Sequence, residues 1–293
     1  MKEKEISDDE IQILGLEYKK TDASRHSNKK KWWIAGILIA AAIFVTGIVF
    51  VIFQNRKSNQ AIETKPVVVQ LDIQSEEAAP AGYIDVSDET VNDVPLRIYI
   101  PKNAIPELSL SLPDETDSTV VFVTQAADIG SNNYGIVGDF VLKGEVLAKG
   151  VRKEGFCSII NQTISLGMNA ETPLLQAVIR EKGYFFRQYP LVSNSEAIDN
   201  KPKGKSIRRA LAIRSGEIIM IESRDKESFH DFAQALADSG VSEAIYLMGS
   251  ADVYGWYRDE QGKQSFFGTK KEKYWDGENF LVWRGKKIGH LLN

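Results

Sequence analysis

The sequence predicts an α+β protein: a mixed, largely antiparallel sheet with a few packed helices, preceded by a single N-terminal transmembrane helix. Three observations lead to this prediction. One uncharged apolar stretch lies near the N-terminus. Short runs rich in Val, Ile, Leu and Phe, bounded by Gly, Asn, Asp or Pro, recur through the rest of the chain and indicate strands. Two segments among them have the apolar spacing of a helix.

The apolar stretch runs from Trp32 to Phe53, and its most polar member is Thr46. At about 1.5 Å per residue, a helix of this length reaches roughly 33 Å, which is enough to cross a hydrocarbon core of about 30 Å. A secretory signal peptide is the alternative, but its apolar core is usually about 7 to 15 residues long and ends at a small-residue cleavage site. We therefore expect a retained membrane anchor.

Basic residues are more numerous before this stretch than after it, which predicts that the N-terminus stays inside. We expect a single-pass protein of the inner (cytoplasmic) membrane with an exported C-terminal domain, either periplasmic or extracellular. The predicted parts are a cytoplasmic tail (1–31), the transmembrane helix (32–53), a tether (54–81) and the exported domain (82–293). The last part is long enough to bury a core as one domain.

Composition limits the partners that the chain can have. A formal net charge of -4, without a basic stripe interleaved with aromatic residues, gives no reason to expect nucleic acid. The single cysteine, Cys157, cannot form an internal disulfide, and its apolar neighbours favour a small buried hydrophobe over a nucleophile. With three histidines and no cysteine pair, we expect no metal site, and we expect no cofactor.

The predicted strands are the runs Leu96–Ile100, Thr119–Thr124, Ile136–Leu142, Cys157–Leu166 and Ala210–Ile221, with a further strand at 67–73 inside the tether. Turn residues at Lys143–Glu145 and at Arg214–Glu217 predict hairpins.

Helices are predicted at Pro173–Arg180, which begins with proline, and at Asp225–Ser239. In the second helix, Ser228 and Asp231 have the spacing of a capping pair, and Gly240 closes the helix at its C-terminus.

A short strand, Val241–Leu247, follows the second helix and leads into a loop of small residues. This order of elements commonly builds a pocket at the end of the strand. Glycines let a backbone approach a ligand, and carboxylate, aromatic and guanidinium groups can contact a sugar phosphate. The candidate residues are Gly249, Ser250, Asp252, Trp256, Tyr257 and Arg258. A hairpin loop with two core aromatics and a surface salt bridge is the alternative.

Arg208 and Arg209 precede a predicted strand, in which neighbouring side chains point to opposite faces. One of them therefore faces inward, and a buried arginine needs an anion. The sequence leaves open which arginine this is. It also leaves open whether the anion is a ligand phosphate or a protein carboxylate such as Asp128 or Asp139.

The order of these segments resembles the phosphodiester glycosidase family, which occurs in many exported bacterial proteins. The resemblance covers roughly Val120–Arg258. It is carried by the strand Val121–Asp128, the hairpin Tyr134–Gly144, Gln188–Val192, the Ser206–Ala210 element with Arg208 on the family's arginine, the helix and strand Ser228–Leu247, and the Tyr-Gly-Trp-Tyr-Arg ending.

This resemblance implies an exported enzyme that hydrolyses a sugar phosphodiester. Its implied roles are phosphate binding by Arg208 and Arg258, proton transfer by Asp252 or Asp128, stacking on the sugar by Trp256 and Tyr257, and substrate contacts by Gln125, Gly249 and Ser250.

The sequence departs from the family where chemistry is expected. Gln125 stands at the family's asparagine, and Met248 stands at its loop aspartate. Methionine cannot act as an acid, base or nucleophile, whereas glycoside cleavage usually employs two carboxyl groups. The alternative function is therefore a catalytically silent envelope module that binds a glycan or a protein through the same cleft.

Overall fold

The computed structural model describes residues 65–71, 81–132, 134–274 and 277–285, all of which belong to one compact unit, Ala61–Asn293. The predicted tail and transmembrane helix, and most of the predicted tether, lie outside the described residues. Neither of the two helices in the described part is long and apolar enough to cross a membrane.

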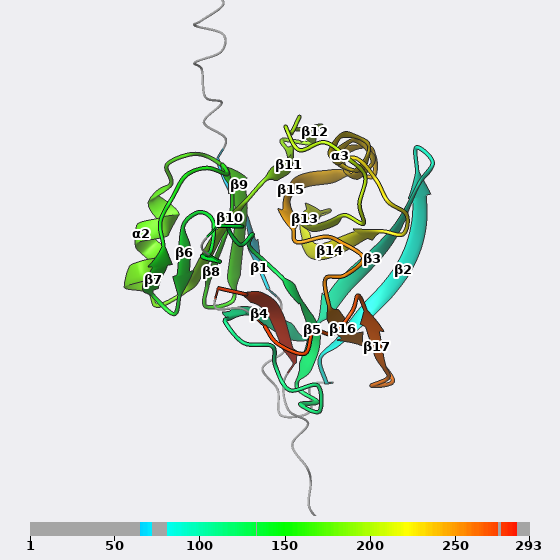
Figure 1. Ribbon diagram of the computed structural model, residues 1–293, viewed down its shortest axis with the longest axis horizontal. Coiled ribbons are helices and arrows are strands. Elements are labelled where there is room, and N and C mark those ends of the chain that lie inside the picture. The colour runs from blue at the N-terminus through cyan, green and yellow to red at the C-terminus, as the bar shows by residue number, and fades with distance from the viewer. Residues whose placement is uncertain (1–64, 72–80, 133, 275–276, 286–293) are drawn as a thin grey trace, which may run out of the picture. The chain divides into compact units, whose positions relative to one another are not determined.

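The described chain forms three sheets, in which every strand pairing is antiparallel, and two helices (Figure 1). Sheet A consists, in spatial order, of β1 (Val67–Gln70), β9 (Thr163–Met168), β8 (Gly155–Ile160), β10 (Tyr184–Gln188), β6 (Phe140–Leu142) and β7 (Glu145–Ala148). Sheet B consists of β12 (Glu196–Ala197), β11 (Pro190–Ser193), β15 (Val241–Leu247), β13 (Arg209–Arg214), β14 (Glu217–Ser223), β3 (Val94–Lys102) and β2 (Tyr83–Val91). Sheet C consists of β17 (Gln264–Phe267), β16 (Gly255–Arg258), β5 (Val120–Gln125), β18 (Phe280–Gly285) and β4 (Ala104–Ser109).

Continuous runs of chain join the sheets. β10 of sheet A continues after Tyr189 as β11 of sheet B, and β3 of sheet B continues after Asn103 as β4 of sheet C. One buried cluster contains Phe186 from sheet A, Leu211 from sheet B and Trp283 from sheet C. The three sheets therefore share a core. Antiparallel sheets with two helices fit an α+β or a mainly β class, and the predicted antiparallel pairing is confirmed.

The first predicted helix is confirmed as α2 (Pro173–Arg180). Thr172 caps it by accepting a hydrogen bond from the backbone N–H of Leu174 at 3.3 Å, and proline fits the first turn because that turn needs no donor. Val178 is buried against Phe156 and Phe185 of sheet A, so α2 covers one face of that sheet (Figure 1).

The second predicted helix is confirmed as α3 (Phe229–Asp238), which packs on sheet B. The hydroxyl of Ser228 accepts a hydrogen bond from the backbone N–H of Asp231 at 3.0 Å, as the capping pair predicts, and Gly240 has φ 87°. The helix begins later than predicted because Glu227 forms a β-bridge with Ser206.

Two strand predictions are corrected. Cys157–Leu166 is a hairpin, β8 and β9, whose turn is possible because Asn161 adopts φ 55°, a conformation that asparagine tolerates well. Of Ile136–Leu142, only β6 is a strand, while Ile136 forms an isolated bridge with Ile129. Cys157 itself is fully buried, and burial raises the pKa of its thiol.

The predicted tether contains an element of the fold. β1 pairs with β9 along its length, from Val67 opposite Leu166 to Gln70 opposite Thr163. Both predicted hairpin turns are present, with positive φ at Lys143 and at Ser215. In each of these two turns the residue with positive φ is followed by a glycine, which also adopts positive φ.

Glu243 on β15 is a carboxylate with 2% exposure. It accepts hydrogen bonds from the backbone N–H of Asn194 at 2.8 Å and from the hydroxyl of Ser193 at 3.3 Å. Burial raises the pKa of Glu243, and these hydrogen bonds offset part of that shift.

We expect Glu243→Gln to raise the free energy of unfolding at neutral pH, because a neutral amide avoids the cost of burying a charge. A carboxyl whose pKa is raised by folding stabilises the protein when protonated, and this stability is lost as the pH rises through the folded-state pKa. The advantage of the variant should therefore shrink between about pH 7 and about pH 4. Urea unfolding at both pH values measures it, and an advantage independent of pH would contradict the prediction.

Candidate functional site

A pocket of about 270 Å³ lies between the end of β5 and the loop that follows β15. We call it the Gln125–Asp252 pocket, after the two predicted site residues that line it. Met248, at the position of the family's loop aspartate, also lines it. The other lining residues are Ile129, Gly130, Ser131, Tyr134, Val253, Lys271 and Glu278.

Gln125 is the last residue of β5 and is 7% exposed. Its side-chain amide forms no hydrogen bond to any residue that the structure describes, although it lines the pocket. The chain beyond it is fixed by Asn279, whose backbone oxygen accepts from Ala126 at 3.1 Å and whose Oδ1 accepts from the N–H of Ala127 at 2.7 Å. Asn279 is fully buried, and these two hydrogen bonds fix the chain beside Gln125 at the pocket wall.

The opposite wall, residues 248–253, is held by Arg209. Its Nε donates to Glu222 Oε2 at 2.5 Å, and its Nη1 donates to the backbone oxygens of Met248 and Val253 at 3.4 and 3.3 Å. The guanidinium also lies over the ring of Phe267, 4.4 Å from its centroid. Arg209 therefore fixes the loop that presents Asp252.

Gly249 and Ser250 do not line the pocket. A Cβ on Gly249 would lie 2.5 Å from the backbone oxygen of Ile207, so glycine is needed for the close approach of two chain segments and not for approach to a ligand. The hydroxyl of Ser250 accepts a hydrogen bond from the N–H of Asp252 at 3.2 Å, which shapes the loop locally.

Arg208 points to the other face of the chain from Arg209, as side-chain alternation predicts. Both arginines are buried, so the prediction that one of them faces inward is corrected, because protein is packed on both faces here. It is 7% exposed and donates from Nε to the backbone oxygen of Glu227 at 2.9 Å and from Nη2 to that of Gly204 at 2.7 Å. Its guanidinium lies 4.2 Å from the ring centroid of Phe229. The structure thus does not bring Arg208 to the Gln125–Asp252 pocket.

The two aspartates considered as arginine partners have other contacts. Asp128 accepts hydrogen bonds from Lys153 and, at 2.9 Å, from Nε2 of Gln188, whereas Asp139 accepts from Nε of Arg187 at 2.6 Å. Lys153 is 4% exposed, and burial lowers the pKa of its ammonium while Asp128 opposes that shift. No sequence motif marks Lys153, because its partners are distant in the chain.

The predicted aromatic and arginine contacts lie in a strand, β16, and not in a loop. Trp256 is fully buried and presents no ring face to a ligand. The ring of Tyr257 packs 5.3 Å from that of Tyr99, and Arg258 donates to the backbone oxygens of Val120 and Glu115 at 3.2 and 2.5 Å. Tyr257 and Arg258 are half-buried, and none of the three residues lines the pocket.

Two charged residues of the pocket were missed in the sequence. Lys271 Nζ lies 2.6 Å from Glu278 Oε1, with side-chain exposures of 44% and 2%. The second oxygen, Glu278 Oε2, is buried without a hydrogen-bond partner in the described structure. No spacing rule identifies these residues, because only the fold brings them beside Gln125.

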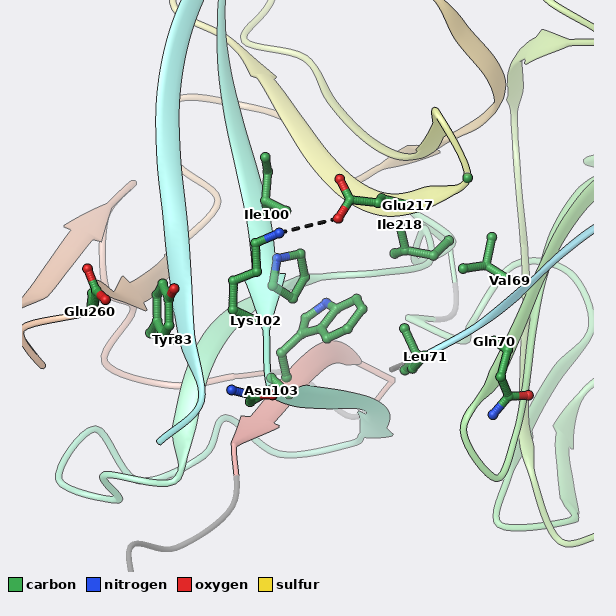
Figure 2. A pocket seen from close by; sticks show the side chains of 14 residues that line it. Val69, Gln70, Leu71, Tyr83, Ile100, Lys102, Asn103, Glu217, Ile218 and Glu260 are labelled. Carbon is green, nitrogen blue, oxygen red and sulfur yellow. Dashed lines mark hydrogen bonds and ion pairs between the residues drawn. The ribbon is translucent and has the colours of Figure 1, made fainter. Parts of the chain in front are cut away.

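A larger pocket of about 560 Å³ contains none of the predicted site residues. Figure 2 shows Lys102 and Glu217 pointing toward one another there, and their charged atoms lie 3.3 Å apart. Glu260 also lines this pocket. Leu71 and Tyr83, on either side of the gap at 72–80, both line it. We assign no function to this pocket.

Comparison with known proteins supports the fold. No protein-family model and no curated protein sequence matches the chain. The structure is similar to the catalytic domain of zebrafish N-acetylglucosamine-1-phosphodiester alpha-N-acetylglucosaminidase, auto-inhibited by its pro-peptide, with a TM-score of 0.52 and 11% identity over 76% of this chain and 89% of that chain. A hypothetical protein from Synechocystis matches with a TM-score of 0.43 and 10% identity over 71% of this chain and 64% of that chain. The first likeness supports a phosphodiester glycosidase-like fold.

We expect Arg209→Met to lower the free energy of unfolding by about 3 kcal/mol, because it leaves Glu222 buried without its partner. Amide hydrogen exchange in residues 248–253 should also become faster, because the hydrogen bonds from Arg209 to the carbonyls of Met248 and Val253 are lost. Arg214→Met, at the other end of β13, is the matched control: its pair with Glu89 is 21% and 34% exposed, and its loss should cost less than about 1 kcal/mol. Equal losses in the two variants would contradict the prediction.

Proposed function

We propose that this chain is a membrane-anchored envelope module whose exported domain binds a glycan in the Gln125–Asp252 pocket without hydrolysing it. The apolar stretch Trp32–Phe53 serves as the anchor, with the N-terminus inside. The observation that carries the proposal is the distribution of polar groups: the amide of Gln125 and the carboxylate of Asp252 line the pocket without side-chain partners among the described residues, whereas the interior arginines are bound to protein atoms.

The pocket wall suits one sugar ring. Ile129, Met248 and Val253 supply apolar surface for the C–H face of a sugar, and the polar groups can bond to its hydroxyls. The volume of about 270 Å³ is just below the range of roughly 300 to 1,000 Å³ typical of drug-sized ligands.

A phosphodiester fits the same wall poorly. Lys271 is the only cationic side chain among the described lining residues, and Glu278 already neutralises it. Neither Arg208 nor Arg258, the residues implied for phosphate binding, lines the pocket. Met248 supplies no proton-transfer group at the position where the resemblance implies one. These contacts favour binding over hydrolysis of a sugar phosphodiester.

The test uses the purified full chain and a panel of neutral, amino and phosphodiester-linked oligosaccharides. We expect saturable binding and no cleavage product. Gln125→Leu and Asp252→Asn should each weaken binding about tenfold, because each removes a hydrogen-bonding group that the sugar uses. Asp199→Asn is the charge-matched control, since that side chain is 94% exposed and lies outside the pocket.

Hydrolysis is the outcome that would overturn this function. A cleavage product from a phosphodiester-linked sugar, lost in Arg208→Ala, would assign the domain to the enzyme class implied by the resemblance. Binding unaffected by both pocket variants would place the glycan elsewhere on the chain.

A further inference from the structure

The buried carboxylate of Glu278 gives the Gln125–Asp252 pocket a chemical preference. We propose that this pocket selects an amino sugar with a free, protonated amine, and that Glu278 receives the ammonium group in place of Lys271. The inference rests on the proposed function, because it names the class of glycan that the pocket takes.

Glu278 has a carboxylate oxygen without a hydrogen-bond partner among the described residues. Its side chain is 2% exposed, Oε1 is bound by Lys271, and Oε2 has no donor within the described part of the chain. A buried polar atom without a partner is costly, and such atoms in folded proteins usually have a water or ligand partner. Glu278 lines the pocket, but Oε2 is closed to solvent with the present contacts, so a ligand can supply the missing donor only when it takes the place of Lys271.

The pocket also carries a net charge. Its lining includes two carboxylates, Asp252 and Glu278, against one ammonium, that of Lys271. The net charge of these groups is negative, which favours a cationic ligand and disfavours a phosphate. A hydroxyl could satisfy Glu278 Oε2, but only an ammonium group also balances this charge.

The contact between Lys271 and Glu278 shows which group this carboxylate accommodates. A primary ammonium already lies 2.6 Å from Glu278 Oε1, so the geometry around that oxygen accommodates this group. Lys271 is 44% exposed, and its side chain can turn into solvent at little cost when a ligand amine replaces it. Lys271 therefore competes with the ligand for the same carboxylate.

This competition predicts effects of opposite sign for the two partners. Glu278→Gln should weaken binding of a glucosamine tetramer about tenfold, because it removes the charged acceptor. Lys271→Gln should tighten the same binding roughly twofold to fivefold, because it removes the internal competitor. A purely structural ion pair would give both variants the same sign.

Isothermal titration calorimetry of the full chain at about pH 6 is the test, since an amine of this kind is then protonated. The unsubstituted chain should bind the glucosamine tetramer about tenfold more tightly than the N-acetylglucosamine tetramer. Lys270→Gln is the matched control: its ammonium pairs with Glu115, at 2.5 Å, and Lys270 is not among the residues that line the pocket.

Each result decides between the proposals. Equal affinity for the two tetramers, with Glu278→Gln unchanged, would overturn amine selection and leave glycan binding in place. Weaker binding in Lys271→Gln would also overturn it, because Lys271 would then assist and not compete. If neither tetramer binds, nor any other member of the oligosaccharide panel, both the inference and the proposed function fail.

Discussion

The buried ion pair between Arg209 and Glu222 is the constraint on which the candidate site depends. It joins β13 to β14, and the same guanidinium reaches the carbonyls of Met248 and Val253. Removing two charges from water is expensive, so such a pair is tolerated only where further hydrogen bonds satisfy its remaining donors. The loop carbonyls provide these bonds. The pocket wall and the centre of sheet B are therefore coupled. If the loop at 248–253 moved, Arg209 would lose hydrogen bonds to two carbonyls, and if Arg209 moved, Glu222 would lose its ion-pair partner.

The same principle explains how the interior cations are distributed. Lys153 is matched by Asp128, Arg187 by Asp139, and Arg208 by two backbone carbonyls and the ring of Phe229. Each contact lies where different segments of the chain meet, and each satisfies a charge that the core would otherwise exclude. As a consequence, Arg208, which the sequence suggested for phosphate binding, instead joins segments of the fold. The amide and charged side chains that line the Gln125–Asp252 pocket are one amide, two carboxylates and a lysine paired with one of these carboxylates.

Local chemistry was readable in the sequence, and long-range pairing was not. Pro173 at the start of α2, the cap at Ser228 and the turn at Ser215–Gly216 act over a few residues, so their patterns predicted α2, α3 and one hairpin. The turn at Asn161 was missed because it lies inside a continuous apolar run. Of the site, Asp252 was anticipated from the loop that follows a predicted strand, and Gln125 was anticipated from the family resemblance. Lys271 and Glu278 were not, since their place beside Gln125 depends on the pairing of β18 with β5.

The strand β16 illustrates how the same residues can suggest two roles. Trp256, Tyr257 and Arg258 have the composition of a sugar-phosphate site, but alternation in a strand sends Trp256 into a buried cluster, where its neighbours are Val123 and Phe280. A similarity to a solved structure at 11% identity shows a similar arrangement of strands and helices, and it does not show that the same side chains act at the site. Because the framework fixes where the wall lies and individual side chains fix what it binds, the proposed glycan binding depends on Met248 and Glu278 and not on the fold alone.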